Sequence, residues 1–135
     1  MQRRRSGDEA RAIVLVGHCR PDAWMLASMV RRAAPEWRVE MASSDEELRR
    51  LLDEADLLLV NRQLDGLFED DSGIALIERF AGDKDAPAIM LVSNFPDAHE
   101  AALKAGAIEG FGKRDLNSPR VAELVRAALS RAEDA

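Results

Sequence analysis

Short apolar runs alternate with longer amphipathic segments along the chain. Four apolar runs cover residues 12–16, 56–60, 88–92 and 108–111, and their length and aliphatic content favour buried strands. A weaker alternating segment over 37–41 predicts one more strand. Strands with nearly continuous apolar sequence are typical of a parallel sheet that is covered on both faces.

Helical patterns occupy the intervals between these runs, and most of them begin at a recognisable start signal. A proline in the first turn or a serine before it favours a helix start, and such residues are Pro21, Ser43 or Ser44, Pro96 and Ser118–Pro119. Pro35 and Gly106 mark two helix ends. A short helix is expected over 73–81, after a long loop that begins at Asn61.

Five successive β-α units predict an α/β fold of the flavodoxin-like type. This fold is a (βα)5 three-layer sandwich whose parallel sheet has the strand order 2-1-3-4-5. We expect residues 1–10 to form a flexible leader and residues 11–135 to form a single domain. Ligands of such folds bind at the carboxyl ends of the strands, near the point where the strand order reverses. The residues that follow the strands there are Gly17, His18, Asn61, Ser93 and Lys113.

Composition and charge indicate which kinds of partner and which cellular compartment we expect for this protein. The 135 residues carry a net charge of -6, which argues against nucleic acid as a partner, although residues 3–5 form one basic run in the leader. The single cysteine, Cys19, rules out an internal disulfide and fits a reducing compartment. No apolar stretch has the length of a membrane span or of a secretory signal. We therefore expect a cytoplasmic protein that does not bind membranes.

The strand ends carry a more specific pattern. Ser93-Asn-Phe-Pro-Asp is followed by Ala105-Gly-Ala and by Phe111-Gly-Lys113, and the third strand ends at Asn61. Over about residues 12–131 this pattern resembles the receiver domain of response regulators in two-component signalling. The resemblance implies a receiver-like domain of phosphorelay signal transduction. In that family a Ser or Thr after strand four and a Lys after strand five contact a phosphoryl group.

The same resemblance shows what this sequence lacks. Receivers hold Mg²⁺ between an acidic pair after strand one and an acceptor aspartate that ends strand three. Here Gly17 and His18 replace the pair and Asn61 replaces the acceptor. An amide is a poor nucleophile and offers Mg²⁺ no charged oxygen. We therefore expect a pseudo-receiver that has no phosphoacceptor, no Mg²⁺, no cofactor and no enzymatic activity, and in which Lys113 hydrogen-bonds Asn61 or a backbone carbonyl.

Two positions near the site depend on the register of the strands. Counting from Pro87 places Val92 at the usual Ser/Thr position, whereas counting back from Lys113 favours Ser93, which we prefer. Receivers often carry an aromatic switch residue on strand five, and its position falls at Gly110. Glycine has no side-chain rotamer to change, and the neighbouring Phe111 is expected to pack in the core.

The loop after Asn61 is about four residues longer than the resemblance implies, and it is acidic. It contains Asp65, Glu69, Asp70 and Asp71, which we interpret as a solvated loop. An alternative is that these carboxylates rebuild a cation site, or that Asp65 serves as a displaced phosphoacceptor.

Other groups of residues in the sequence give weak evidence for a functional site. Structural zinc takes four closely spaced ligands, whereas His18, Cys19 and His99 offer three without such spacing, so we expect no metal site. His18 also lacks the flanking Asp and Gly of a cobalamin loop, and no nucleophile elbow or phosphate-binding glycine loop is present. Trp24 and Met25 are expected to make packing or partner contacts.

The favoured interpretation is a stand-alone pseudo-receiver that acts as a phosphorylation-independent protein-interaction module. Its partner would be a signalling kinase, an output protein or a second copy. The resemblance implies docking at the face made by helix four, strand five and helix five, which carries His99, Glu100, Lys104, Gly110, Phe111, Arg120 and Arg126. Two alternatives stay open: phosphotransfer that uses the carboxylates of residues 65–71, and small-ligand sensing in the strand-end pocket.

Overall fold

A five-stranded parallel sheet forms the centre of the molecule in the computed structural model, which describes residues 11–134. The strand order is β2-β1-β3-β4-β5, so the predicted flavodoxin-like topology is confirmed. The strands are β1 (Ala12–Val16), β2 (Arg38–Ala42), β3 (Ala55–Asn61), β4 (Ala88–Val92) and β5 (Ile108–Phe111). The leader predicted over residues 1–10 lies outside the described part of the chain.

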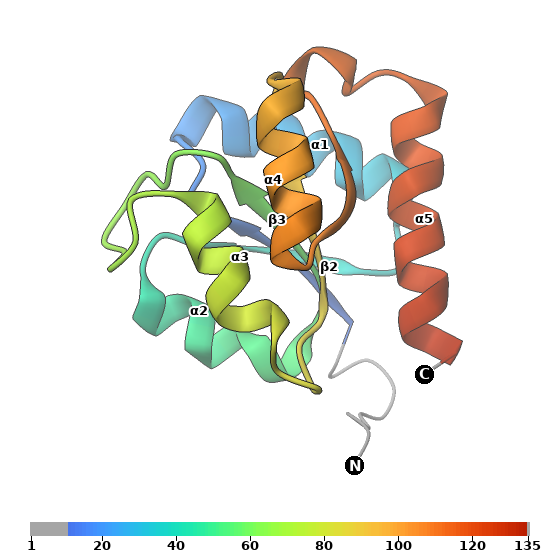
Figure 1. Cartoon of the computed structure of the whole chain (residues 1–135). Coiled ribbons are helices and arrows are strands. Elements are labelled where there is room, and N and C mark those ends of the chain that lie inside the picture. Colours follow the sequence, from blue (N-terminus) through green and yellow to red (C-terminus); the bar gives the residue numbers. More distant parts are fainter. Residues whose placement is uncertain (1–10, 135) are drawn as a thin grey trace.

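Helices cover both faces of this sheet and complete three layers (Figure 1). The helices α1 (Arg20–Ala33) and α5 (Pro119–Asp134) pack on one face. The other face is covered by α2 (Asp45–Leu51), α3 (Gly73–Ala81) and α4 (Pro96–Ala105). Two 3-10 turns, Leu52–Glu54 and Lys113–Asp115, complete the elements.

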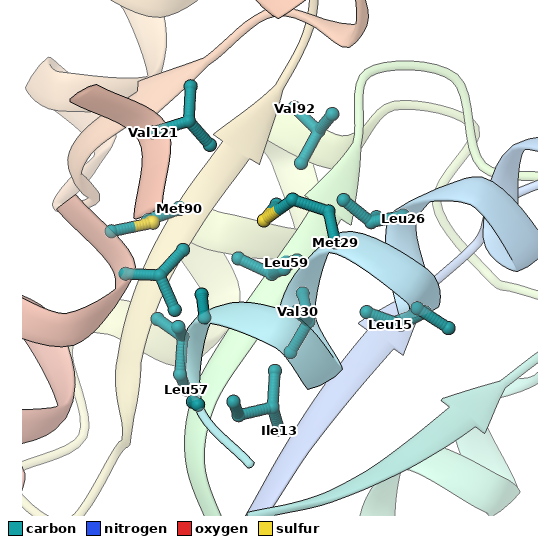
Figure 2. Close-up of a cluster of buried hydrophobic side chains, with 14 of the residues drawn as sticks. Ile13, Leu15, Leu26, Met29, Val30, Leu57, Leu59, Met90, Val92 and Val121 are labelled. Carbon is teal, nitrogen blue, oxygen red and sulfur yellow. The ribbon is translucent and has the colours of Figure 1, made fainter. Parts of the chain in front are cut away.

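The sheet divides the core into two apolar clusters because successive side chains of a strand point to opposite faces. In β1, Ile13 and Leu15 point towards α1 and α5, whereas Val14 and Val16 point towards the other three helices. Figure 2 shows the first cluster, where strand residues meet Leu26, Met29 and Val30 of α1 and Val121 of α5. Burial on both faces explains why the central strands are almost wholly apolar.

Side-chain caps fix the starts of two helices. The Ser44 hydroxyl accepts a hydrogen bond from the Glu47 backbone N–H at 3.1 Å, so Ser44 rather than Ser43 is the N-cap of α2. The Glu47 carboxylate in turn accepts from the Ser43 backbone N–H at 2.7 Å, one residue earlier than in a standard capping box. Ser72 caps α3 by accepting from two backbone N–H groups. At the other end of a helix, Gly106 closes α4 with a φ of 115°, the left-handed conformation expected of it.

Strand β5 contains an irregularity that the sequence pattern did not predict. Met90 pairs with Ile108 and Val92 pairs with Phe111, so two residues of β5 stand opposite Leu91. This is the geometry of a β-bulge. A Cβ on Gly110 would lie 2.1 Å from the Leu91 carbonyl oxygen, so only glycine fits there. The bulge turns Phe111 into the core, where it is buried as expected.

None of the helices in the described residues is long and apolar enough to cross a membrane.

Candidate functional site

The carboxyl ends of β3 and β4 and the segment after β5 meet around a cavity of about 130 Å³. Asn61, Ser93 and Lys113 line it, so three of the expected strand-end residues come together. The other lining residues are Arg62, Gln63, Val92, Asn94 and Phe95. Gly17 and His18 are not among the residues that line it.

Gly17 is held in place by the loop that follows β3. Its φ is +73°, and its carbonyl oxygen accepts hydrogen bonds from the Asn61 side chain at 3.0 Å and from the Asp65 backbone N–H at 2.9 Å. A Cβ on Gly17 would lie 2.6 Å from Leu64 Cδ2. The Leu64 side chain therefore fills the space that an acidic side chain at position 17 would need.

Asn61 acts as a hydrogen-bond donor at the end of β3. Its side-chain nitrogen donates to the carbonyl oxygens of Gly17 at 3.0 Å and Gln63 at 2.7 Å. An aspartate here would place a carboxylate oxygen against two carbonyl oxygens, which disfavours its ionised form. Asparagine thus ties the end of β1 to the start of the loop after β3.

Several further contacts fix this loop, which we call the β3–α3 loop (residues 62–72). The Leu64 backbone N–H donates to the Asp71 carbonyl, and the Leu67 backbone N–H donates to the Ser43 carbonyl. An ion-pair network ties the loop to two helices, because Arg79 of α3 contacts Asp70 at 2.7 Å and Asp45 of α2 at 3.0 Å. None of the loop carboxylates lines the strand-end cavity. Asp70 serves the network, and Asp65, Glu69 and Asp71 are exposed.

Lys113 pairs with a carboxylate that the sequence analysis did not single out. Its Nζ lies 2.7 Å from Oδ2 of Asp22, in the first turn of α1. The expectation that Lys113 hydrogen-bonds Asn61 or a backbone carbonyl is therefore wrong. The hydrogen bond from Lys113 holds the pKa of Asp22 below its usual value. Asp22 was not among the predicted site residues, and its place in the first turn of α1, shortly after the end of β1, was the signal that could have identified it.

His18 is turned away from the cavity and towards the neighbouring strand. Its Nε2 donates to the Leu59 carbonyl at 2.8 Å, and its Nδ1 is buried without a hydrogen-bond partner among the described residues. Burial lowers the pKa of His18 to about 4. At neutral pH this imidazole is uncharged, and it cannot replace an acidic ligand.

Ser93, which we preferred for the Ser/Thr position, and Val92, the alternative, both line the cavity. Val92 is packed in the core, whereas Ser93 follows β4 and its hydroxyl accepts from the Phe95 backbone N–H at 3.1 Å. The Ser93 carbonyl also accepts a hydrogen bond from Nε2 of His99 at 2.6 Å. His99 is therefore a half-buried residue of α4 with a defined hydrogen-bond partner.

A second and larger cavity, of about 640 Å³, opens on the face of α4, β5 and the start of α5. Of the predicted partner-face residues, His99, Gly110, Phe111 and Arg120 line it. Glu100 and Lys104 are exposed on α4 outside the cavity. Arg126 points elsewhere, since one guanidinium nitrogen lies 3.5 Å from the Ala33 carbonyl at the end of α1.

The described residues contain no group of three or more His, Cys, Asp or Glu side chains that could hold a metal ion. Neither the zinc alternative nor a cation site in the β3–α3 loop gains support from their arrangement.

Comparisons with known proteins identify the fold. No protein-family model and no curated protein matches the chain. Among solved structures, the signal receiver domain of a DNA-binding response regulator from Colwellia psychrerythraea aligns with a TM-score of 0.73 and 16% identity, over 89% of this chain and 98% of that chain. A response regulator receiver domain protein from Methanospirillum hungatei gives 0.67 and 19%, over 92% and 97%.

A third similar structure is the signal receiver domain of an HD domain-containing protein from Pseudomonas fluorescens. It gives a TM-score of 0.69 and 17% identity, over 96% of this chain and 94% of that chain. At such identities the likeness establishes architecture. The chain has the fold of response-regulator receiver domains.

Proposed function

We propose that this chain is an atypical receiver-like domain that acts in signal transduction as a phosphorylation-independent protein-interaction module. The observation that carries the proposal is the closure of the strand-end site by the protein itself. Leu64 packs against Gly17, and the Asn61 amide donates to the Gly17 carbonyl. An apolar side chain and an amide donor thus occupy the region where phosphoryl transfer needs carboxylate oxygens.

The chemistry of the cavity supports the same proposal. Transfer of a phosphoryl group to a carboxylate needs an oxygen nucleophile and a cation that neutralises the phosphoryl charge. Among the described residues, no Asp or Glu lines this cavity, and the charged residues that line it are Arg62 and Lys113. Within residues 11–134, the carboxylate that contacts Lys113 is Asp22, which is already paired by that contact. We propose that the domain takes up no phosphoryl group, uses neither Mg²⁺ nor another cofactor, and catalyses no reaction.

The proposed docking surface is the 640 Å³ cavity of the α4–β5–α5 face. Gly110 lines it, and Leu103, with 51% of its surface exposed, contributes an apolar side chain to its lining. Proposed occupants are a signalling kinase, an output protein or a second copy of the chain, in the cytoplasm. Nucleic acid and membranes are not proposed as partners of this face.

The test of the proposed function is an amide NMR titration of the full chain with Mg²⁺ and beryllofluoride, which mimics a phosphoryl group. We expect no saturable shifts at Asn61, Ser93 or Lys113. A receiver that retains its acidic residues serves as the positive control. Saturable shifts at those three residues would refute the proposal and would favour the displaced carboxylates of residues 65–71.

A second candidate, small-ligand sensing, is favoured by one observation. Two cations, Arg62 and Lys113, line the 130 Å³ cavity together with hydroxyl and amide groups, and no carboxylate of the described part of the chain lines it. Such a lining suits a small oxyanion. The same NMR titration with inorganic phosphate and no Mg²⁺ tests this candidate, and shifts confined to the cavity would support it.

A further inference from the structure

The outward surface of α1 combines apolar and cationic side chains. Trp24 has 70% of its surface exposed and Met25 has 49%, which makes them the two largest apolar side chains that this helix leaves in solvent. The other exposed residues of α1 are Arg20, Pro21, Arg31 and Arg32. Together these six residues form what we call the α1 face.

Helical spacing places these residues side by side. Trp24 follows Arg20 by four residues and precedes Arg31 by seven, so the three share one side of the helix. Met25 is related to Pro21 and Arg32 in the same way. Residues that point into the core, such as Leu26 and Val30, lie on the opposite side and are 2% exposed or less.

The α1 face contains no exposed acidic residue. The one carboxylate of α1, Asp22, is turned towards Lys113 and pairs with it. The face is therefore cationic, although the whole chain carries a net charge of -6. Arg126 of α5 extends it, because its guanidinium reaches the Ala33 carbonyl at the end of α1. Such a local reversal of charge complements an acidic surface.

Trp24 contributes little to the fold, which distinguishes it from the second tryptophan. The indole N–H of Trp37 donates to the buried Asp56 carboxylate at 2.9 Å, and the Trp37 ring packs against the core. Trp24 remains mostly in water, where a large aromatic surface is unfavourable. Tryptophan and arginine are also the residues most enriched at the energetic centres of protein interfaces.

We propose that the α1 face binds an amphipathic helix of a partner protein, in which an apolar stripe is flanked by Asp and Glu residues. Trp24 and Met25 would pack against the apolar stripe, and the arginine guanidinium groups would pair with the carboxylates while their alkyl stems cover apolar surface. This surface is separate from the α4–β5–α5 cavity, since α1 and α4 lie on opposite faces of the sheet (Figure 1). The inference rests on the proposed role as an interaction module and gives that role a partner chemistry.

The test uses a synthetic helical peptide with leucine at heptad core positions and glutamate on both flanks. Two matched peptides serve as controls: one has lysine in place of glutamate, and one has the same composition in scrambled order. Each is titrated into the isotope-labelled full chain without Mg²⁺. We expect the glutamate peptide to shift the Trp24 indole signal and the amides of Arg20–Ala33, and to leave the Trp37 indole signal unchanged.

Variants of the protein show whether the α1 face carries the binding. Trp24→Ala and the double variant Arg20→Glu, Arg31→Glu should each weaken binding of the peptide at least tenfold. Met41→Ala removes an exposed apolar residue of β2, outside both proposed surfaces, and should leave it unchanged. Thermal melting confirms that the variants fold, which is expected because the substituted side chains are exposed.

Several outcomes would overturn the proposal. These are no shift at millimolar glutamate peptide, equal binding of either control peptide, shifts that map to α4 and β5, or α1 shifts that appear on raising the concentration of the protein alone. Shifts of the α1 face produced by phosphatidylglycerol vesicles or a DNA duplex, but not by the peptide, would also overturn it. Beryllofluoride binding would refute the proposed function. The peptide titration could still be interpreted in that case, because it contains neither beryllofluoride nor Mg²⁺.

Discussion

Asn61 shows how one side-chain amide changes the chemistry at the strand ends. Its nitrogen donates to two backbone carbonyls, so the residue binds the protein's own backbone and offers no nucleophile to a phosphoryl group. The neighbouring Lys113 is likewise engaged, since it pairs with Asp22. At the scale of single residues, Asn61 and Lys113 both bind partners within the chain.

His18 makes stability depend on pH in a defined window. Burial lowers its pKa from 6.5 to about 4, so between these values the unfolded state binds more protons than the folded state. The stability that the neutral imidazole confers is fully present above about pH 6.5 and is lost as the pH falls to about 4. The loss amounts to about 3 kcal/mol of unfolding free energy.

Urea denaturation at a series of pH values measures this loss. His18→Gln, which keeps a donor for the Leu59 carbonyl, should flatten the curve between pH 6.5 and 4. The matched variant His99→Gln should retain the slope of the wild type. An unchanged slope in His18→Gln would show that another group is responsible.

At the scale of elements, the bulge in β5 determines the shape of the α4–β5–α5 face. It places Gly110 against the Leu91 backbone and turns Phe111 into the core. A side chain cannot be added at Gly110 without separating β5 from β4.

Gly110→Ala is therefore expected to reduce the free energy of unfolding by about 2–3 kcal/mol, because its Cβ would overlap the Leu91 carbonyl. Gly82→Ala is the matched control, since a Cβ there meets nothing within 4 Å and its φ of -76° suits any residue. The control should change stability by less than about 0.5 kcal/mol. Chemical denaturation measures both, and hydrogen exchange of the β5 amides locates the damage. Equal stability of the two variants would contradict the close approach.

At the scale of the whole molecule, segments that are distant in the sequence meet at the strand ends. The β1 end supplies Gly17, while the β3 end and the β3–α3 loop that follows it supply Asn61 and Leu64, and Arg79 holds that loop to α2 and α3. Introducing carboxylates at these positions therefore does not by itself provide the space that they need.

The triple variant Gly17→Asp, His18→Asp, Asn61→Asp is expected to be less stable than the wild type and to show no saturable beryllofluoride shift. A side chain at position 17 would clash with Leu64, and the φ of +73° at this position favours glycine. Adding Leu64→Ala to the triple variant removes the side chain that blocks position 17. If this steric block is what prevents binding, the quadruple variant should bind beryllofluoride. Tight binding by the triple variant itself would show that the loop yields easily.

Local patterns in the sequence determined most of the architecture. Apolar runs and helix-start residues predicted all five strands and five helices, because burial on both faces and capping leave marks within a few residues. Boundaries shifted by one or two residues where a tertiary contact intervened, as in β3, which begins at Ala55 next to the buried Asp56 that accepts from Trp37. That positions 17, 18 and 61 carry Gly, His and Asn rather than acidic residues could also be read directly from the sequence.

Only the tertiary structure decided which contacts the strand-end residues make. Lys113 and Asp22 are 91 residues apart, and His18 and Leu59 are 41 residues apart, so no local pattern marks either contact. The packing of Leu64 on Gly17, the bulge at Gly110 and the charge of the α1 face likewise depend on which segments meet in space. The sequence by itself determined the fold and the residue types at the strand ends, because both can be read from residue type and short spacing. The closed site and its surfaces depend on long-range contacts, which exist only once the chain has folded.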